Sequence, residues 1–509
     1  MSLIESHERA GVAAVAALVE CNPFGPERVE LEQRVLGAAF QPTGMVWFAE
    51  GDEDVFDPNL GRLRQRVEEL AGQLRTRLVA GVPATPAELA DYRGAVFYLL
   101  FLRYEDDWLA LSTASENGRG GAKPVGFYER FAADVVHFLG PLPDPTPDPA
   151  HLFALGFQVR RAFHHIFRKI FGAAAPAARL RASVWHSIFT RDPARYRAAF
   201  YDRMADFPTL ITGESGTGKE LVARAIALSQ YIPFDPSTQS FVADPAAGFS
   251  AVNLAALNPA LIESELFGHR RGAFTGAIDD HAGWFERCSR YGAVFLDEIG
   301  ELDAAIQVKL LRVLQDREFH RIGDAEPRRF AGRVIAATNR HLEQEIAAGR
   351  FRDDLYYRIC ANLIHMPTLR EQVAADPDHL RNLLLIIARR VAGPAEAERV
   401  ADDVHRYVVT QLGVQYQWPG NIRELEQCLR NVVIHGEYRP RRVPSAEPDA
   451  AGELAGSLRR GALTADALVQ RYAALVYAHT GSLQETARRL GLDWRTVRKL
   501  VGPGGRNGE

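Results

Sequence analysis

Apolar and polar positions alternate along this chain with two different periods, which divide it into regions. Between residues 1 and about 140, apolar patches recur at helical spacing and a polar, glycine-rich break falls at 118–121, so this region is predicted to be mostly helical. From about residue 173 to 438, short β-type runs alternate with longer helical segments, which predicts a parallel sheet with crossover helices. Residues 457–509 return to helical spacing.

Two stretches that contain proline and polar residues separate these regions. In residues 141–149 every second position is proline, which excludes a helix there and predicts a stiff extended spacer. The following residues, 152–171, have the pattern of a basic amphipathic helix, which either packs against its own neighbour or binds a partner; we favour packing. Residues 439–456 are polar, contain proline and arginine, and are predicted to be a linker.

The composition is that of ordinary globular protein. With 509 residues, of which 47% are hydrophobic and 24% charged, the chain is too long for one core, and about three or four domains are expected. The longest apolar run in the N-terminal region, 95–102, is far shorter than the roughly 20 residues of a membrane span. The N-terminus lacks a signal-peptide pattern, and the four cysteines are scattered without metal-ligand spacing. These features predict a cytoplasmic protein with no membrane partner.

The charge is distributed unevenly. The whole chain has a net charge of −4, which argues against a protein that coats nucleic acid along its entire surface. Residues 457–509, in contrast, contain nine Arg or Lys against four Asp or Glu. A basic terminal module on an acidic body is compatible with DNA binding at one end, although a run of charge alone is more often a solvated face.

A glycine-rich loop between a strand and a helix predicts a nucleotide site. Residues 209–212 form a short β-type run and 221–226 a helical one; between them stand Gly213, Glu214, Ser215, Gly216, Thr217, Gly218, Lys219 and Glu220. The glycines let backbone amides surround phosphates, the helix N-terminus adds free amides, and Lys219 reaches the terminal phosphates. Glu220 stands where Ser or Thr usually helps to hold magnesium, so the metal needs another ligand.

Two further strand ends offer that ligand and a base. The apolar run 293–296 ends at Asp297 and Glu298; Asp297 can hold Mg²⁺, and Glu298 can orient or deprotonate the attacking water. The run 334–337 ends near Asn339, a candidate sensor of the terminal phosphate. An acidic pair after a strand is by itself more often a solvated turn. Because the phosphate loop lies upstream in the same alternating pattern, we favour the catalytic interpretation.

The segment 263–277, ESELFGHRRGAFTGA, closely resembles the surface loop that marks bacterial enhancer-binding proteins, the AAA+ ATPases that activate sigma-54 RNA polymerase. The resemblance covers 210–431, and Glu220 is the family's usual residue at its position. It implies an α/β AAA+ core with a helical lid and ATP and Mg²⁺ as cofactors. It also implies a loop that engages sigma-54, made of Gly272, Ala273, Phe274, Thr275, Gly276 and Ala277, with Phe274 and Thr275 in contact.

The resemblance assigns further roles to single residues. Asn253 matches the residue that pairs with the catalytic glutamate, here Glu298, and couples nucleotide state to the loop. Arg352 and Arg358 lie in a segment that resembles the source of arginine fingers, which reach the ATP of a neighbouring subunit and stabilise charge on the transferred phosphoryl group. Arg423 matches the residue with which the lid contacts the nucleotide.

The C-terminal residues have helix-turn-helix spacing. A helix is predicted around 483–490, a turn at Gly491 and a second helix at 494–501, similar to the Fis-type domain that ends many enhancer-binding proteins. Arg495, Thr496, Arg498 and Lys499 are the candidate DNA contacts. The predicted core residues of this module are Ala487, Leu490, Leu492 and Val497. A helical hairpin without a DNA role is the alternative.

Together these patterns predict six segments: an N-terminal regulatory region of unknown type (1–150), a linker helix (151–172), the AAA+ α/β core (173–370), the AAA+ helical lid (371–438), a linker (439–456) and a Fis-type helix-turn-helix domain (457–509). The function that they imply is ATP-dependent transcriptional activation, in which the protein binds double-stranded DNA upstream of a promoter and remodels sigma-54 RNA polymerase to the open complex. The expected oligomer ranges from a dimer to a hexameric ring.

Two other functions compete with this one. An AAA+ machine of another kind, such as an unfoldase or chelatase subunit, is disfavoured by the loop 272–277 and the C-terminal helix-turn-helix. A DNA-binding regulator on a decayed ATPase is disfavoured by Lys219, Asp297, Glu298 and the two finger arginines. Residues 1–150 show no receiver-domain pattern, and 233–249 is an insertion relative to the family pattern without a role that the sequence reveals.

Overall fold

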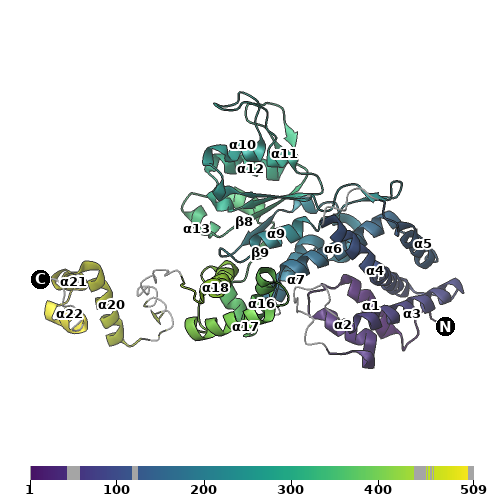
Figure 1. Ribbon diagram of the computed structural model, residues 1–509, viewed down its shortest axis with the longest axis horizontal. Coiled ribbons are helices and arrows are strands. Elements are labelled where there is room, and N and C mark those ends of the chain that lie inside the picture. Colours follow the sequence, from purple (N-terminus) through teal and green to yellow (C-terminus); the bar gives the residue numbers. More distant parts are fainter. Residues whose placement is uncertain are drawn as a thin grey trace. The chain divides into compact units, whose positions relative to one another are not determined.

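The computed structural model of the chain (Figure 1) describes residues 2–42, 58–116, 124–172, 174–440, 454, 457–458, 461 and 463–501. The chain divides into two compact units, Met1–Gly436 and Glu437–Glu509. The first unit holds a helical N-terminal region, a parallel sheet with its helices and a helical lid, and the elements described in the second unit are helices. The predicted α/β fold with helical regions at both ends is confirmed.

The N-terminal region is a bundle of helices around a large aromatic core. Its elements are α1 (Arg9–Glu20), α2 (Glu27–Leu36), η1 (Gly37–Ala39), α3 (Leu60–Val79), α4 (Pro86–Glu116), α5 (Tyr128–Leu139), α6 (Pro149–Lys169) and α7 (Ala175–Phe189). Trp108 of α4 lies with its ring centroid 5.7 Å from that of Phe131 and 5.8 Å from that of Phe153. A Cβ on Gly156 of α6 would lie 2.1 Å from the Trp108 ring, so the close approach of α4 and α6 requires glycine there.

The proline-rich residues between α5 and α6 do not act as a spacer between separate bodies. Leu142 is buried in the same core as both helices, and α5 packs on α6. Pro149 occupies the first turn of α6, where it needs no hydrogen-bond donor, and the Asp148 side chain accepts from the Ala150 amide at 3.0 Å. The prolines therefore end one helix and begin the next, and the expectation of an extended spacer was wrong because the apolar faces on either side attract each other.

The insertion 233–249 joins the N-terminal region to the core. It contains a short antiparallel pair, β2 (Phe234–Asp235) and β3 (Ser240–Phe241). The ring of Phe234 lies 4.6 Å from that of Phe153, and Phe241 lies 4.4 Å from Phe157, both on α6. The Val125 amide donates to the Gln239 carbonyl at 2.7 Å. The insertion thus covers the aromatic core of the helical region.

The core sheet has five parallel strands in the order β4–β5–β8–β1–β9. They are β1 (Thr209–Thr212), β4 (Phe249–Asn253), β5 (Ala293–Asp297), β8 (Arg333–Thr338) and β9 (Asn362–His365). Strands β5 and β8 are almost fully buried, as expected for a parallel sheet with helices on both faces. The strands predicted at 209–212, 293–296 and 334–337 are all present and are neighbours.

The other elements of the first unit connect the strands and form the lid. Around the sheet lie α8 (Pro193–Arg195), η2 (Tyr196–Phe200), η3 (Met204–Asp206), α9 (Lys219–Ala227), η4 (Leu254–Ala256), α10 (Pro259–Phe267), α11 (Trp284–Arg287), η5 (Ile299–Glu301), α12 (Ala304–Asp316), the hairpin β6 (Glu318–Phe319) and β7 (Arg328–Arg329), α13 (Leu342–Ala347) and α14 (Asp353–Ile359). The lid consists of α15 (Leu369–Ala375), α16 (His379–Ala392), α17 (Ala397–Tyr407), η6 (Val408–Leu412) and α18 (Asn421–His435). A capping box of Thr368 and Glu371 begins α15.

Between residues 463 and 501, the second unit forms the helices α20 (Ala465–Thr480), α21 (Leu483–Leu490) and α22 (Trp494–Val501). The last two occupy the residues predicted for the helix-turn-helix, and Gly491 between them has φ 64°. Ala487 and Val497 are buried as predicted, whereas Leu490 is half-buried and Leu492 is 36% exposed. The assignment of Leu492 to the core was wrong because this residue lies in the turn and not on an inward helix face.

Among the described residues, none of the helices combines the length and the apolar character that a membrane crossing requires.

Candidate functional site

Four strand ends bring the predicted nucleotide residues to one edge of the sheet. Strand β1 runs into the glycine-rich loop, β5 ends at Asp297, β8 ends just before Asn339, and β4 ends at Asn253. The strand register pairs Asn253 with Asp297. Because parallel strands point the same way, these carboxyl ends share one edge, which is where α/β sheets bind ligands.

The loop 213–220 wraps around the amino end of α9. Gly216 and Gly218 have φ values of 79° and 93°, a backbone conformation that side chains disfavour. The ammonium of Lys219, the first residue of α9, donates to the carbonyl oxygens of Gly213 at 2.9 Å and Glu214 at 3.2 Å. Burial lowers the Lys219 pKa, and the nearby carboxylates of Glu298 and Asp297 oppose that effect. The loop therefore holds the Lys219 ammonium among its own backbone carbonyl groups.

The lid rests directly on this loop. A Cβ on Gly216 would lie 2.2 Å from the carbonyl oxygen of Gly420, at the start of α18. The Ile422 amide donates to the Gly216 carbonyl at 3.1 Å, and Arg423 donates to the Ser215 hydroxyl at 3.3 Å. The predicted lid residue Arg423 thus lies beside the predicted phosphate loop, and its proposed contact with nucleotide is compatible with that position.

Two lid residues that the sequence did not single out also hold the loop. Arg370 of α15 makes two hydrogen bonds to the Glu214 carboxylate, at 2.6 and 3.1 Å, which lower the Glu214 pKa. The amide of Asn421 donates to Glu214 and to the Ser215 carbonyl, each at 3.1 Å. Asn421 follows Gly420 in the run that resembles the family's lid helix, and that proximity was the available signal. No local pattern pointed to Arg370.

The acidic pair has a constrained geometry. Glu298 adopts the left-handed conformation, with φ 56°, which costs a non-glycine residue roughly 1–2 kcal/mol. Its carboxylate accepts a hydrogen bond from the backbone amide of Asn339 at 3.1 Å, so the ends of β5 and β8 are linked. Asp297 is half-buried, and burial raises its pKa, with the Glu220 carboxylate adding to the effect and Lys219 opposing it. Backbone strain at a polar sheet edge is typical of functional sites.

Asn253 does not hydrogen-bond to Glu298 in this structure. The Asn253 side chain instead accepts from the Ala256 amide at 3.2 Å and caps η4. The two residues lie at the ends of β4 and β5, which are adjacent strands. Their expected pairing remains a prediction.

The loop 272–277 projects from the core between α10 and α11. Gly272 and Gly276 have φ values of 82° and 101°. The ring of Phe274 is 37% exposed and packs edge-on against His269, with ring centroids 4.9 Å apart, while Thr275 is exposed. Ala277 is buried at the base of the loop, so it is not part of the exposed surface. The neighbouring Ile278, just after the loop, is a second exposed large apolar side chain, with 76% of its surface accessible.

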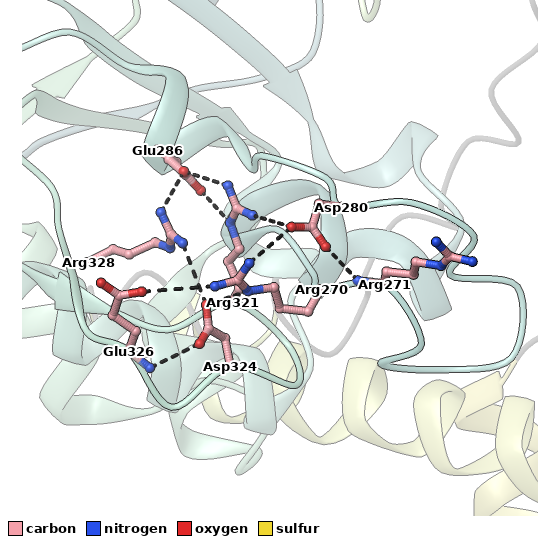
Figure 2. A network of polar contacts seen from close by, with 8 residues as sticks. All are labelled: Arg270, Arg271, Asp280, Glu286, Arg321, Asp324, Glu326 and Arg328. Carbon is pink, nitrogen blue, oxygen red and sulfur yellow. Dashed lines mark hydrogen bonds and ion pairs between the residues drawn. The ribbon is translucent and has the colours of Figure 1, made fainter.

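A network of charged side chains anchors the base of this loop (Figure 2). Arg270, before the loop, donates to Asp280 at 3.1 Å and to Asp324 at 3.0 Å, and the Arg271 amide donates to Asp280 at 2.8 Å. Arg321 binds Glu286 through two hydrogen bonds of 2.8 and 2.6 Å. The network ties the loop to the segment between β6 and β7, so the loop does not stand on glycine turns alone.

The finger candidates occupy the surface around α14. Arg352 makes two hydrogen bonds to Asp354, at 3.0 and 2.7 Å, and Arg358 donates to the Leu314 carbonyl of α12 at 3.1 Å. Both side chains are exposed. Their hydrogen-bond partners come from α12 and α14, not from the phosphate loop or the acidic pair.

The DNA-contact candidates all belong to α22 of the second unit. Arg495, Thr496, Arg498 and Lys499 are exposed, while Val497 between them is fully buried. The helix begins with the Asp493 carboxylate accepting from the Arg495 amide at 2.8 Å. One face of α22 therefore packs in the unit and the other carries positive charge.

Comparison with known proteins gives a coherent set of matches. The family model described as the Sigma-54 interaction domain matches residues 196–365. The chain is 41% identical to the Nif-specific regulatory protein of Klebsiella pneumoniae over 269 residues. The aligned region covers 50% of this chain and 47% of that protein. It is 37% identical over 295 residues to the DNA-binding transcriptional regulator NtrC of Rhizobium meliloti, with 56% of each chain covered. The chain thus spans about half the length of these relatives.

Among solved structures, NtrX from Brucella abortus is similar at 23% identity and a TM-score of 0.38, over 74% of this chain and 79% of that one.

Proposed function

We propose that this chain is a sigma-54-dependent enhancer-binding activator and that it uses ATP hydrolysis to remodel sigma-54 RNA polymerase at promoters. The match of residues 196–365 to the Sigma-54 interaction domain supports this proposal. One observation carries the proposal. A single sheet edge gathers the phosphate loop, the acidic pair and Asn339, while the loop 272–277 projects elsewhere and shares none of those residues. This arrangement separates an ATP site from a surface that contacts a partner.

In the proposed ATP site, backbone amides of the loop 213–218 and Lys219 bind the phosphates, and Arg423 reaches them from the lid. Asp297 holds Mg²⁺, which supplies positive charge against the phosphate oxygens. The donor set fits such an ion, because burial and the nearby Glu220 carboxylate raise the pKa of Asp297, and a bound cation would offset both effects. Glu298 then orients and deprotonates water, and Asn339 senses the terminal phosphate.

The proposed route from this site to the loop begins at Glu298. One oxygen of its carboxylate accepts from the backbone amide of Asn339 at the end of β8, and the predicted pairing with Asn253 would give the carboxylate a partner at the end of β4. Asn253 leads into η4 and α10, and α10 leads directly to the loop. A change of partner at Glu298 would therefore displace the segment on which the charged network and the loop stand.

The active sites are proposed to form between subunits of a ring, with Arg352 and Arg358 reaching a neighbour's ATP. ATPase activity per subunit is then expected to rise with protein concentration. Arg358→Ala and Lys219→Ala subunits, each inactive alone, should recover part of the wild-type rate when mixed, because one class of mixed interface has both an intact loop and an intact finger. The measurement is phosphate release against mixing ratio, with Arg350→Ala, which loses only an exposed pair with Glu345, as the control. No recovery at any ratio would count against fingers that act between subunits.

The second unit is proposed to bind double-stranded DNA through α22. Arg495→Ala and Lys499→Ala should each weaken binding, and the wild-type affinity should fall steeply as salt rises, because phosphate contacts release counterions. Each lost phosphate contact should reduce the slope of log affinity against log salt by about 0.9. Arg471→Ala, on α20 and outside the predicted contacts, is the matched control in fluorescence anisotropy with promoter-upstream DNA. Binding of the full chain that is insensitive to salt and to both substitutions would refute the assignment.

The two competing functions make different predictions for the same preparation. A decayed ATPase hydrolyses no ATP. Another kind of AAA+ machine hydrolyses ATP but neither binds DNA through α22 nor activates a sigma-54 promoter. The N-terminal region is proposed to regulate the motor, and its aromatic contacts with the insertion 233–249 support a route for that control.

A further inference from the structure

The N-terminal helical region contains a group of side chains that the proposed ATPase and DNA functions do not use. Glu116 is the last residue of α4, and His164 and His165 are consecutive residues of α6. Across the part of the chain that the structure describes, theirs is the group of three His, Cys, Asp or Glu side chains whose ligand atoms all lie within 4.8 Å of one another. The group connects two helices that pack side by side.

The two imidazoles are buried without hydrogen bonds at the atoms that face the carboxylate. His164 and His165 are only 5% and 2% exposed. His164 Nε2 lies 3.8 Å from one Glu116 oxygen and His165 Nδ1 lies 3.2 Å from the other, and neither nitrogen has a hydrogen-bond partner. Buried polar atoms are nearly always satisfied in folded proteins, so two orphaned nitrogens aimed at one carboxylate require an explanation.

A metal ion bound between the three side chains would give each of them a ligand bond. Nitrogen and oxygen ligands lie about 2.0–2.2 Å from Zn²⁺, and at tetrahedral angles two such ligands are about 3.4 Å apart. The two histidine–carboxylate separations of 3.2 and 3.8 Å bracket that spacing, and the two histidine nitrogens lie within 4.8 Å of each other. We propose that Glu116, His164 and His165 bind a divalent late-transition-metal ion of the Zn²⁺ class.

The donor atoms select this class over hard cations. Arg168 lies 4.0 Å from the Glu116 carboxylate, and Arg161 and Lys169 are on the same helix. These cations repel every divalent ion alike. Mg²⁺ and Ca²⁺, however, bind through oxygen ligands, of which the group offers one carboxylate, whereas neutral imidazole nitrogens suit Zn²⁺, Ni²⁺ or Cu²⁺. Three protein ligands leave one coordination position open, and Glu116 is partly exposed, so the ion can exchange with the medium.

The site is close in the fold to the ATPase core. Helix α6 also carries Gln158, which donates to the Ser229 carbonyl at 2.9 Å, and Arg161, which donates to the Gln230 carbonyl. These carbonyls follow α9, the helix that begins with Lys219. The metal ion would therefore lie on a helix that directly contacts the end of the phosphate-loop helix.

The test uses full-length protein without a histidine tag, stripped of metal with a chelator and free of nucleotide. Titration with Zn²⁺ against a chromophoric chelator should give one tight site per chain, and Co²⁺ should produce the visible absorption bands of a four- or five-coordinate site. Glu116→Gln and His165→Asn should each lower Zn²⁺ affinity by at least about tenfold. His137→Gln, an exposed histidine of α5, should leave the affinity unchanged.

Circular dichroism and thermal unfolding without metal establish that each variant is folded. If His165→Asn does not fold, Glu116→Gln, which changes a partly exposed carboxylate, still decides the question. Zn²⁺ should raise the unfolding temperature of wild-type protein and not that of Glu116→Gln. The proposal is overturned if folded wild-type protein binds no stoichiometric Zn²⁺, if Glu116→Gln binds it as tightly as wild type, or if Mg²⁺ or Ca²⁺ displaces it at equal concentration.

Discussion

Lys219→Ala is expected to lose ATP binding, and Glu298→Gln is expected to bind ATP normally while hydrolysing it about 10²–10⁴ times more slowly. The Lys219 ammonium is held among the carbonyl oxygens of the phosphate loop, where a charged phosphate oxygen would gain a strong hydrogen bond. The Glu298 carboxylate, in contrast, directly follows β5, at the sheet edge where we propose that the attacking water binds. Removal of its charge affects the chemical step and leaves the phosphate contacts in place.

The measurement is nucleotide affinity and phosphate release on the same preparations. Glu301→Gln is the matched control, because Glu301 is three residues away and pairs with Arg340, outside the proposed machinery. Wild-type hydrolysis by Glu298→Gln would show that another group activates the water. Normal ATP affinity in Lys219→Ala would show that the loop 213–220 does not bind the phosphates through Lys219.

Thr275→Ala is expected to keep ATP hydrolysis and DNA binding and to lose open-complex formation. Thr275 is exposed on a loop whose base is held by the charged network and whose tip has no hydrogen bond to the nucleotide residues. Loss of the Thr275 hydroxyl should therefore leave the ATP site and α22 unchanged and remove a contact with sigma-54. Thr238→Ala, in the exposed turn between β2 and β3, is the control for loss of a surface hydroxyl.

Ile278→Ala extends this comparison. Because Ile278 is more exposed than Phe274 and adjacent to the loop, it is expected to weaken nucleotide-dependent binding to sigma-54 as well. The sequence-based description of the loop did not include this residue.

Local patterns were enough to predict most of the elements that position the ATP site. The strand–loop–helix around Lys219, the strand ending at Asp297 and the two last helices were all predicted, because each depends on hydrophobic period and on glycine within a short segment. The contact between Glu214 of the phosphate loop and Arg370 of the lid was not predicted, because 156 residues separate the two in the sequence. The same holds for the docking of the insertion on Phe153 and for the cluster at Glu116, which arise only when distant helices pack.

The assignment of Leu492 to the core of the last helices was wrong. It rested on residue type and position in a motif, and the structure leaves this residue 36% exposed. Burial of a turn residue depends on the last few degrees of chain direction, which a spacing pattern does not specify.

The central claim is that ATP hydrolysis at the sheet edge is coupled to sigma-54 through the loop 272–277. Its most direct test is in vitro transcription from a sigma-54 promoter, run beside an ATPase assay on the same preparations of wild type, Thr275→Ala and Thr238→Ala. The account predicts equal ATPase rates for all three proteins and open complexes only with wild type and Thr238→Ala. Normal activation by Thr275→Ala, or none by wild type despite full ATPase activity, would contradict it.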